Sequence, residues 1–174
     1  MVSATEQRRF AGVVLLVLIL DIATKLAAEA WLPRHIGVSV IGDFFQLRLV
    51  YNPGAAFGIH VGEHSRWVFM VLSTAALFIL ASMLKTTKPG DTVRLYSLAL
   101  IFAGAAGNLI DRIRSPKGVV DFLDFTFGSY HFPTFNIADT AVTCGALLLA
   151  ISLWNEGSEQ TVAAPAAMEQ TRET

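Results

Sequence analysis

The chain has 174 residues, of which 53% are hydrophobic and 16% are charged, and its mean hydropathy is +0.53. Because soluble proteins average roughly 25% charged residues, this composition predicts a membrane protein that folds as one domain. The net charge of −1 gives no sign of the concentrated basic face that nucleic-acid binding requires, and the single Cys144 excludes an internal disulfide.

Residues 10–30 are predicted to form the first membrane span. They amount to roughly 31 Å of helix, which is enough to cross the hydrocarbon core of a bilayer. A cleavable secretory signal is the competing interpretation, because Arg8 and Arg9 precede an apolar stretch and Ala28-Glu29-Ala30 resembles a cleavage site.

Asp21 and Lys25 follow this apolar stretch at helical i,i+4 spacing. Such a pair is unusual behind the apolar core of a signal peptide, so we favour a retained span. Two interpretations of the pair stay open. An exposed pair contributes only about 0.2–0.5 kcal/mol to a helix, whereas a pair that points into the bundle is a candidate functional feature.

Residues 31–66 are predicted to leave the membrane, because prolines, glycines and charges are scattered through them. Apolar and polar side chains alternate over residues 45–51, which predicts a strand with one apolar face. Asn52-Pro53-Gly54 predicts a turn. The small, apolar segment Ala55-Ala56-Phe57-Gly58 that follows indicates a backbone lying close to another part of the molecule.

His60 and His64 precede the second predicted span, residues 67–84. Their spacing occurs in metal sites, but no third ligand lies nearby. We therefore expect no metal here and interpret the segment as the start of an interfacial helix.

The third predicted span, residues 94–112, carries small residues at positions 104–107, which allow helices to approach closely. It ends with Asn108, Asp111 and Arg112, whose i, i+3 and i+4 spacing projects them from one face. They could be only the interfacial end of a span. The neighbouring glycine-rich surface favours a polar cluster directed into the bundle.

Residues 125–132 predict two short aromatic strands joined by a Gly128-Ser129 turn. Asn136 is a candidate N-cap of the fourth span, residues 137–154, with Asp139 in its first turn. Capping alone would explain both residues. A carboxylate at the head of a long uncharged stretch nevertheless needs a partner, because an unpaired buried charge costs several kcal/mol.

Four spans put both termini on the same side of the membrane. The distribution of lysines and arginines slightly favours the cytoplasm for the termini, with residues 156–174 as a disordered cytoplasmic tail. The polar residues then gather near the opposite, extracytoplasmic face: Asp21, Asn52, Asn108, Asp111, Arg112, Asp121, Asp124, Asn136 and Asp139.

This gathering of carboxylates indicates aspartyl chemistry. The chain has no His-Glu-x-x-His motif and no Gly-x-Ser-x-Gly motif, and its cysteine lies within a span, so the usual parts of metal, serine and cysteine hydrolysis are missing. Two carboxylates close together in a poorly solvated site share a proton. Asp121 and Asp139 are the best candidates, because apolar residues flank each of them, and Asp124 is a weaker third.

Five short motifs follow one another from the first span to the fourth. They are Asp21-x-x-x-Lys25, Asn52-x-Gly54-Ala55-Ala56-Phe57-Gly58, Gly104-x-x-Gly107-Asn108-x-x-Asp111-Arg112, Val119-Val120-Asp121-Phe122 and Phe135-Asn136-x-Ala138-Asp139. Each motif alone is weakly specific. Together, in this order and spacing, they resemble the motifs of the lipoprotein signal peptidases (signal peptidase II).

The resemblance implies an all-α membrane protein with four transmembrane helices, a small extracytoplasmic β-sheet and an interfacial loop, the last two falling within residues 38–66. It implies Asp121 and Asp139 as the catalytic pair, with Asp21 and Lys25 supporting the site from the first span. The substrate site would be lined by Asn52, Gly54, Asn108, Asp111, Arg112 and Asn136.

The implied activity is that of an aspartyl endopeptidase of the bacterial inner membrane. It would cleave prolipoproteins before the cysteine that carries diacylglycerol, near the periplasmic face and without a cofactor or metal. Its partners would be lipid-modified prolipoproteins, membrane lipid and peptide inhibitors of the family. We expect a monomer and no nucleic-acid partner.

Two other function classes remain as alternatives. In a small proton-coupled transporter, Asp21, Asp111 and Asp139 would form a relay. The sequence has no internal repeat, and its acidic residues cluster at one face rather than through the membrane depth. In a non-enzymatic scaffold, the aspartates would be only helix caps and interfacial charges.

Overall fold

A computed structural model of the chain describes residues 2–54 and 62–170, with only the backbone described at Glu63 and over 156–170. Its four long helices are α1 (Ala4–Trp31), α2 (Ser65–Thr86), α3 (Thr92–Arg114) and α4 (Ile137–Gln170). All four are long and apolar enough to cross a membrane; in α4 the qualifying part is Ile137–Asn155. They coincide with the four predicted spans.

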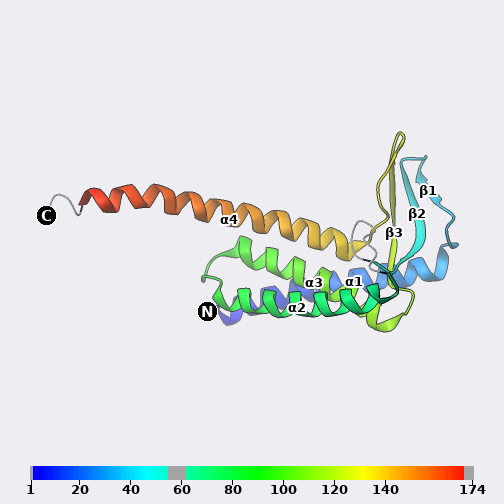
Figure 1. The fold of residues 1–174 in the computed structure, drawn as a ribbon, viewed down its shortest axis with the longest axis horizontal. Coiled ribbons are helices and arrows are strands. Elements are labelled where there is room, and N and C mark those ends of the chain that lie inside the picture. The colour runs from blue at the N-terminus through cyan, green and yellow to red at the C-terminus, as the bar shows by residue number, and fades with distance from the viewer. Residues whose placement is uncertain (1, 55–61, 171–174) are drawn as a thin grey trace.

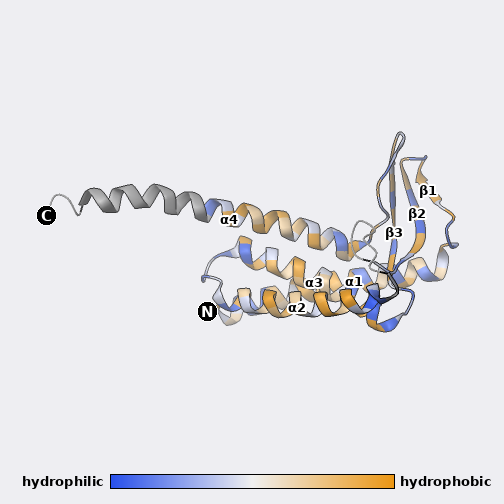
Figure 2. Ribbon diagram, viewed as in Figure 1, coloured by the Kyte–Doolittle hydropathy of each residue, from blue (hydrophilic) through white to orange (hydrophobic). Residues whose placement is uncertain are grey.

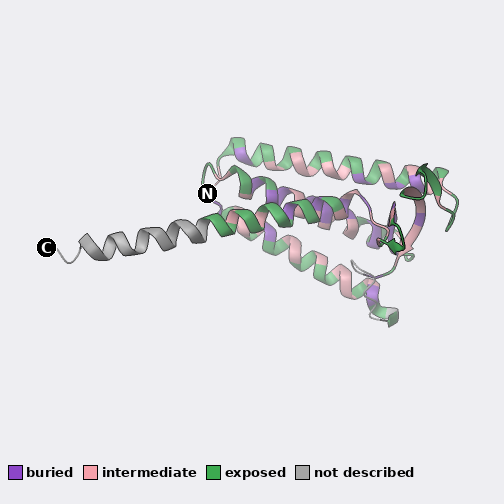
Figure 3. Cartoon of the chain, turned by 90° about the horizontal axis from the view of Figure 1, so that it is seen from above, coloured by how far each residue is buried: buried purple, intermediate pink, exposed green. Residues whose placement is uncertain are grey.

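The helices run side by side, and α3 packs against each of the other three (Figure 1). Apolar side chains cover their outer surfaces, for example Leu16 of α1, Phe78 of α2 and Ile151 of α4, which are all exposed (Figures 2 and 3). Lipid would cover such surfaces in a membrane, because a soluble protein rarely exposes so much contiguous apolar area.

Local sequence signals set the helix ends. Ser3 and Glu6 form a capping box at the start of α1, and the second oxygen of Glu6 accepts a hydrogen bond from the Gly90 amide at 2.7 Å, which joins α1 to the α2–α3 turn. Asp91 caps α3. His64, at the end of the 3-10 turn η2 (Gly62–His64), precedes α2, as predicted for a helix start. His60 and residues 55–58 lie outside the described residues.

An antiparallel sheet lies across one end of the bundle (Figure 1). Its order is β1 (Val38–Ile41), β2 (Phe45–Asn52), β3 (Val119–Phe127) and β4 (Tyr130–His131). The predicted strand over residues 45–51 is confirmed, and so is the aromatic hairpin, in which Phe127 pairs with Tyr130 across the Gly128-Ser129 turn.

The prediction that β2 has one continuous apolar face is wrong. Phe45 pairs with Phe125, but Tyr51 pairs with Val120, so the register shifts by one residue along β2. A β-bulge of this kind reverses which face the following side chains occupy. Leu49 and Tyr51 therefore pack beside α1 in the buried core, on the face opposite Phe45.

The predicted disordered tail also differs from the structure, because the backbone continues α4 as helix to Gln170. Alanine, glutamate and glutamine, which are strong helix formers, outnumber the helix-opposing Gly157 and Pro165 in this segment. They also extend a helix that already exists, so they avoid the cost of nucleation.

Candidate active site

Polar side chains gather where the sheet meets the helix bundle, and one lysine lies at their centre. The Lys25 ammonium, with 1% of the side chain exposed, lies 2.8 Å from Asp21 and 2.9 Å from Asp111 and donates to Asn108 Oδ1 at 3.0 Å. The pair on α1 therefore points into the bundle, and the alternative of an exposed surface pair is excluded. The positive charge of Lys25 thus offsets the negative charges of Asp21 and Asp111 in a region that solvent does not reach.

Asp21 also joins α1 to the start of α4. Its Oδ1 accepts a hydrogen bond from the Ala138 amide at 2.9 Å, one of the amides left free at a helix N-terminus. Close packing makes this contact possible: a Cβ added at Gly107 would meet Asp21 Oδ2 at 2.5 Å, and one at Gly104 would clash with the Ala138 carbonyl. The small residues of α3 thus bring α1 and α4 together, as the sequence predicts.

Asn136 and Asp139 form a reciprocal cap at the start of α4. Asn136 Oδ1 accepts from the Asp139 amide at 2.9 Å, and Asp139 Oδ2 accepts from the Asn136 amide at 3.2 Å. The predicted capping role is confirmed. The cap also fixes the Asp139 carboxylate, whose other oxygen accepts from Asn108 Nδ2 at 2.8 Å.

Asp121 lies on β3 and is 2% exposed. Its two oxygens accept from Asn52 Nδ2 at 3.1 Å and from Asn136 Nδ2 at 2.7 Å. The bulge in β2 makes the first contact possible, because Val50 pairs with Asp121 and Asn52, two residues later, lies on the same face of the sheet. Without the bulge Asn52 would face the opposite side.

The environment of Asp121 strongly favours its protonated form. Burial first, and then the negative charge of Asp139, raise the pKa of Asp121 to about 7, against the weaker opposing effect of the amide donors of Asn52 and Asn136. The Asp121 carboxyl can therefore hold a proton near neutral pH.

Both aspartates line one cavity of about 540 Å³. Asn136 contacts both of them and is fully buried, so it fixes one carboxylate relative to the other. The remaining wall comes from β2, β3, the segment before α4 and the facing sides of α2, α3 and α4. It includes Asn52, Phe69, Ser73, Ala105, Asn108, Arg112, Val119, Phe132, Pro133, Thr134, Phe135, Thr140, Val142, Thr143 and Cys144.

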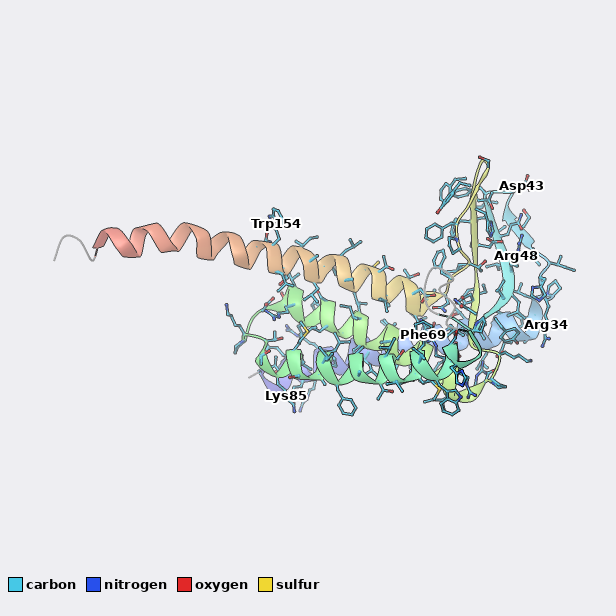
Figure 4. All side chains as sticks on the ribbon, in the orientation of Figure 1. Arg34, Asp43, Arg48, Phe69, Lys85 and Trp154 are labelled. Atoms are coloured by element: carbon cyan, nitrogen blue, oxygen red, sulfur yellow. The ribbon has the colours of Figure 1, made fainter. Side chains whose placement is uncertain are left out.

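Arg112 supplies the positive charge on the cavity wall. It is 6% exposed, donates to the carbonyls of Asn108 and Gly54 at 3.0 Å each, and lies over the ring of Phe69, which is labelled in Figure 4. The Gly54 amide in turn donates to Asn52 Oδ1 at 3.0 Å. Within the described part of the chain, the Arg112 Nε is buried without a hydrogen-bond partner.

The structure connects all ten residues predicted for the site: Asp21, Lys25, Asn52, Gly54, Asn108, Asp111, Arg112, Asp121, Asn136 and Asp139. Asp111, for example, accepts from the Val120 amide at 3.2 Å. Asp124, the weaker candidate, is not part of this network. It lies on the other face of β3 and forms ion pairs with Arg48 and His131.

Sequence reasoning missed the side chains of α2 and α4 on the cavity wall, including Phe69, Ser73 and Thr143. The weak signal available was the scatter of hydroxyl groups in spans that are otherwise apolar. Nothing in the sequence indicated which side of α2 faces α3, because apolar residues occur on every side of this helix.

Comparison with known proteins agrees with this geometry. The family model for signal peptidase (SPase) II matches residues 13–155. The chain belongs to the signal peptidase II family.

Individual relatives extend this likeness over most of the chain. The lipoprotein signal peptidase of Syntrophus aciditrophicus is 43% identical over 152 residues, covering 84% of this chain and 92% of that protein. The one from Desulforapulum autotrophicum is 41% identical over 136 residues, covering 76% and 83%.

Two solved bacterial membrane enzymes share the fold. One has a TM-score of 0.79 at 31% identity, covering 87% of this chain and 90% of its own. The other has a TM-score of 0.74 at 32% identity, covering 83% and 92%.

Membership of the signal peptidase II family makes the chain a protease with four membrane-spanning helices. The transporter alternative is therefore not favoured. The contacts of Asp21 and Lys25 with α3 and α4 also favour a retained first span over a cleaved signal, because α1 supplies the centre of the polar network.

Proposed function

We propose that this member of the signal peptidase II family is an aspartyl endopeptidase. It removes signal peptides from diacylglyceryl-modified prolipoproteins by cleaving before the lipidated cysteine. The observation that carries the proposal is the pair of carboxylates at one cavity, Asp121 and Asp139, held together by Asn136.

The pair acts as general acid and general base. Near neutral pH the two carboxyl groups share one proton, and a coupled pair of this kind titrates as a unit. The ionised member takes a proton from water, and the resulting hydroxide attacks the scissile carbonyl carbon. The protonated member gives its proton to the carbonyl oxygen. The carboxyl that took the proton from water then gives it to the leaving nitrogen, while the other carboxylate takes a proton from a hydroxyl of the tetrahedral intermediate. The C–N bond breaks, a carboxylic acid and an amine leave, and no covalent enzyme intermediate forms.

Neighbouring residues bind and orient the substrate in this proposal. Asn52 and Arg112 supply amide and guanidinium groups at the cavity wall. The backbone of Gly54 binds both side chains and so helps to fix this part of the substrate site. Asn108 and Asn136 orient the two carboxylates. Asp111, together with Asp21 and Lys25, fixes the helices that carry these groups.

The apolar section of the cavity supports a lipid-modified substrate. Ala105, Val142 and Cys144 extend the cavity wall along α3 and α4, away from the carboxylates. Acyl chains and a signal helix enter from the bilayer, whereas water reaches the carboxylates from the end of the bundle at which the sheet lies.

The proposed setting is the bacterial inner membrane, with the protein as a monomer surrounded by lipid. Both termini are cytoplasmic, and the sheet and the aspartates lie at the periplasmic face. Peptides that mimic the cleavage region are the inhibitors expected for this site, and the mechanism needs no cofactor or metal.

The decisive experiment compares a diacylglyceryl-modified precursor with its unmodified counterpart, each incubated with purified protein in lipid. We expect cleavage of the modified precursor only. Asp121→Asn and Asp139→Asn should insert and fold but not cleave, whereas Asp43→Asn, an exposed aspartate at the edge of the sheet labelled in Figure 4, should cleave normally. Normal cleavage by either active-site variant would contradict the mechanism.

A further inference from the structure

The sheet has two chemically different faces beyond the β2 bulge. Phe45, Leu123 and Phe125 lie on the face that carries Asp121. Gln46 pairs with Asp124, and Thr126 pairs with His131, so these polar side chains share the opposite face. We call this second surface the polar face of the sheet.

Asp124 is a buried charge on the polar face that the proposed reaction does not use. Its side chain is 1% exposed and forms two ion pairs, with Arg48 Nε at 2.9 Å and with His131 Nε2 at 3.2 Å. Arg48 comes from β2 and His131 from β4, so one carboxylate on β3 joins three strands. Thr126 Oγ1 lies 3.2 Å from the other ring nitrogen of His131 and holds the ring in place.

The strand that Asp124 holds leads directly into the cavity wall. His131 is followed by residues 132–135, all of which line the cavity. This segment is bonded back to β3: the Phe132 amide donates to the Phe125 carbonyl at 2.9 Å, and the Phe135 amide donates to the Leu123 carbonyl at 3.0 Å. The next residue is Asn136, which contacts both aspartates.

Contacts between aromatic rings also connect β3 to residues 132–135, on the face of the sheet that carries Asp121. Phe125 stacks on Phe135 with centroids 5.8 Å apart, and Phe135 meets the edge of Phe132 at 5.6 Å. A shift of the β3–β4 hairpin would therefore move two side chains of the cavity wall. Such a shift is opposed by the ion pairs of Asp124 on the polar face.

We propose that Asp124, together with Arg48 and His131, is a positioning cluster that holds residues 132–135 against the cavity for substrate binding. The proposal rests on the peptidase function proposed above and adds three residues to it. None of the three touches the reacting atoms. Their loss therefore weakens substrate binding and leaves the chemical step of bound substrate largely intact.

The two basic partners of Asp124 give the cluster a specific signature. Among the described residues, the basic groups at ion-pair distance from Asp124 are Arg48 and His131. When Arg48 is replaced by glutamine, His131 is the basic partner that remains. Both side chains should act on the hairpin only through Asp124.

The first test measures steady-state cleavage and hydrogen exchange on the same preparations. Asp124→Asn should raise KM on the order of tenfold, as expected for loss of a charge-assisted contact, while kcat stays within about twofold. Exchange at the amides of Phe132 and Phe135 should speed up. The control Asp43→Asn removes the same charge from an exposed position of the sheet and should change neither quantity.

The second test is a double-mutant cycle. Arg48→Gln and His131→Asn should each raise KM, and neither should raise it further when combined with Asp124→Asn, because both side chains act through Asp124. Since wild type is measured alongside, a failure of the peptidase function itself would appear as absent cleavage by wild type.

An unchanged KM with unchanged exchange in Asp124→Asn would overturn the positioning role. So would a loss of kcat alone, because it would assign the cluster to the chemical step. An unchanged KM in His131→Asn would remove His131 from the cluster.

Discussion

Asp121 and Asp124 lie three residues apart on β3, and each is 2% exposed, yet their surroundings differ completely. Asp124 faces two basic side chains on the polar face of the sheet. Asp121 faces two asparagine amides and lies near a second acid. Burial first, and then the charge of Asp139, raise the pKa of Asp121 to about 7. Burial alone therefore does not identify a reactive carboxylate. The two carboxylates differ in their partners, because basic side chains meet Asp124, whereas amides and a second acid meet Asp121.

The largest expected effect separates the two aspartates by activity. Asp121→Asn should lower kcat by at least about two orders of magnitude, because it removes a group that transfers protons in the reaction. Asp124→Asn should leave kcat nearly unchanged. Cleavage of a lipid-modified precursor at saturating concentration measures this difference. Equal losses of kcat in the two variants would show that Asp121 and Asp124 do not differ in their role in the chemical step.

The next prediction concerns Lys25, the buried cation at the centre of the polar network, and its effect on stability. Lys25→Met should destabilise the protein by about 3–5 kcal/mol, because it leaves Asp21 and Asp111 buried without their common cation. Unfolding in detergent, followed by circular dichroism, measures this loss. Lys85→Met, which removes an exposed lysine from the end of α2, is the matched control and should change stability little.

The pH dependence of stability also distinguishes Asp121 from Asp124. In the unfolded chain Asp121 ionises near its ordinary pKa of 3.8, whereas in the folded protein it stays protonated up to about 7. The folded state thus binds more protons over this interval, and the contribution of Asp121 to stability is lost as the pH rises from about 4 to about 7.

Asp121→Asn should abolish this loss, so its thermal midpoint relative to wild type should rise over the same pH interval. Asp124→Asn breaks buried ion pairs and should lower the midpoint instead. Parallel curves for wild type and Asp121→Asn between these pH values would contradict the raised pKa.

The smallest expected effect concerns Arg112, the one basic side chain on the cavity wall among the residues that the structure describes. Phe69→Leu removes the ring over which the Arg112 guanidinium lies at 5.7 Å, a contact of about 0.5–2 kcal/mol. We expect a rise in KM of a few fold at unchanged kcat. Phe78→Leu, at an exposed position of the same helix, should have no effect on either constant.

The sequence predicted those features that depend on neighbouring residues. The four spans follow from uncharged stretches of sufficient length, and the aromatic hairpin follows from its Gly128-Ser129 turn. The helical spacing of Asn108, Asp111 and Arg112 was enough to predict a common face. The site residues required the combined motifs as well, because no single one of them is specific.

Long-range register and packing decided the rest. Alternation along β3 separates Asp121 from Asp124, but the residues of β2 that share a face with each of them depend on a bulge in β2, a strand about 70 residues earlier. The orientation of α2, and so the part played by Phe69, depends on its packing against α3, since an evenly apolar helix has no preferred side. The sequence by itself determined which elements form and which polar groups are available. Only the tertiary structure decided which carboxylate meets a cation and which meets another acid, because that choice is made by residues distant in the chain.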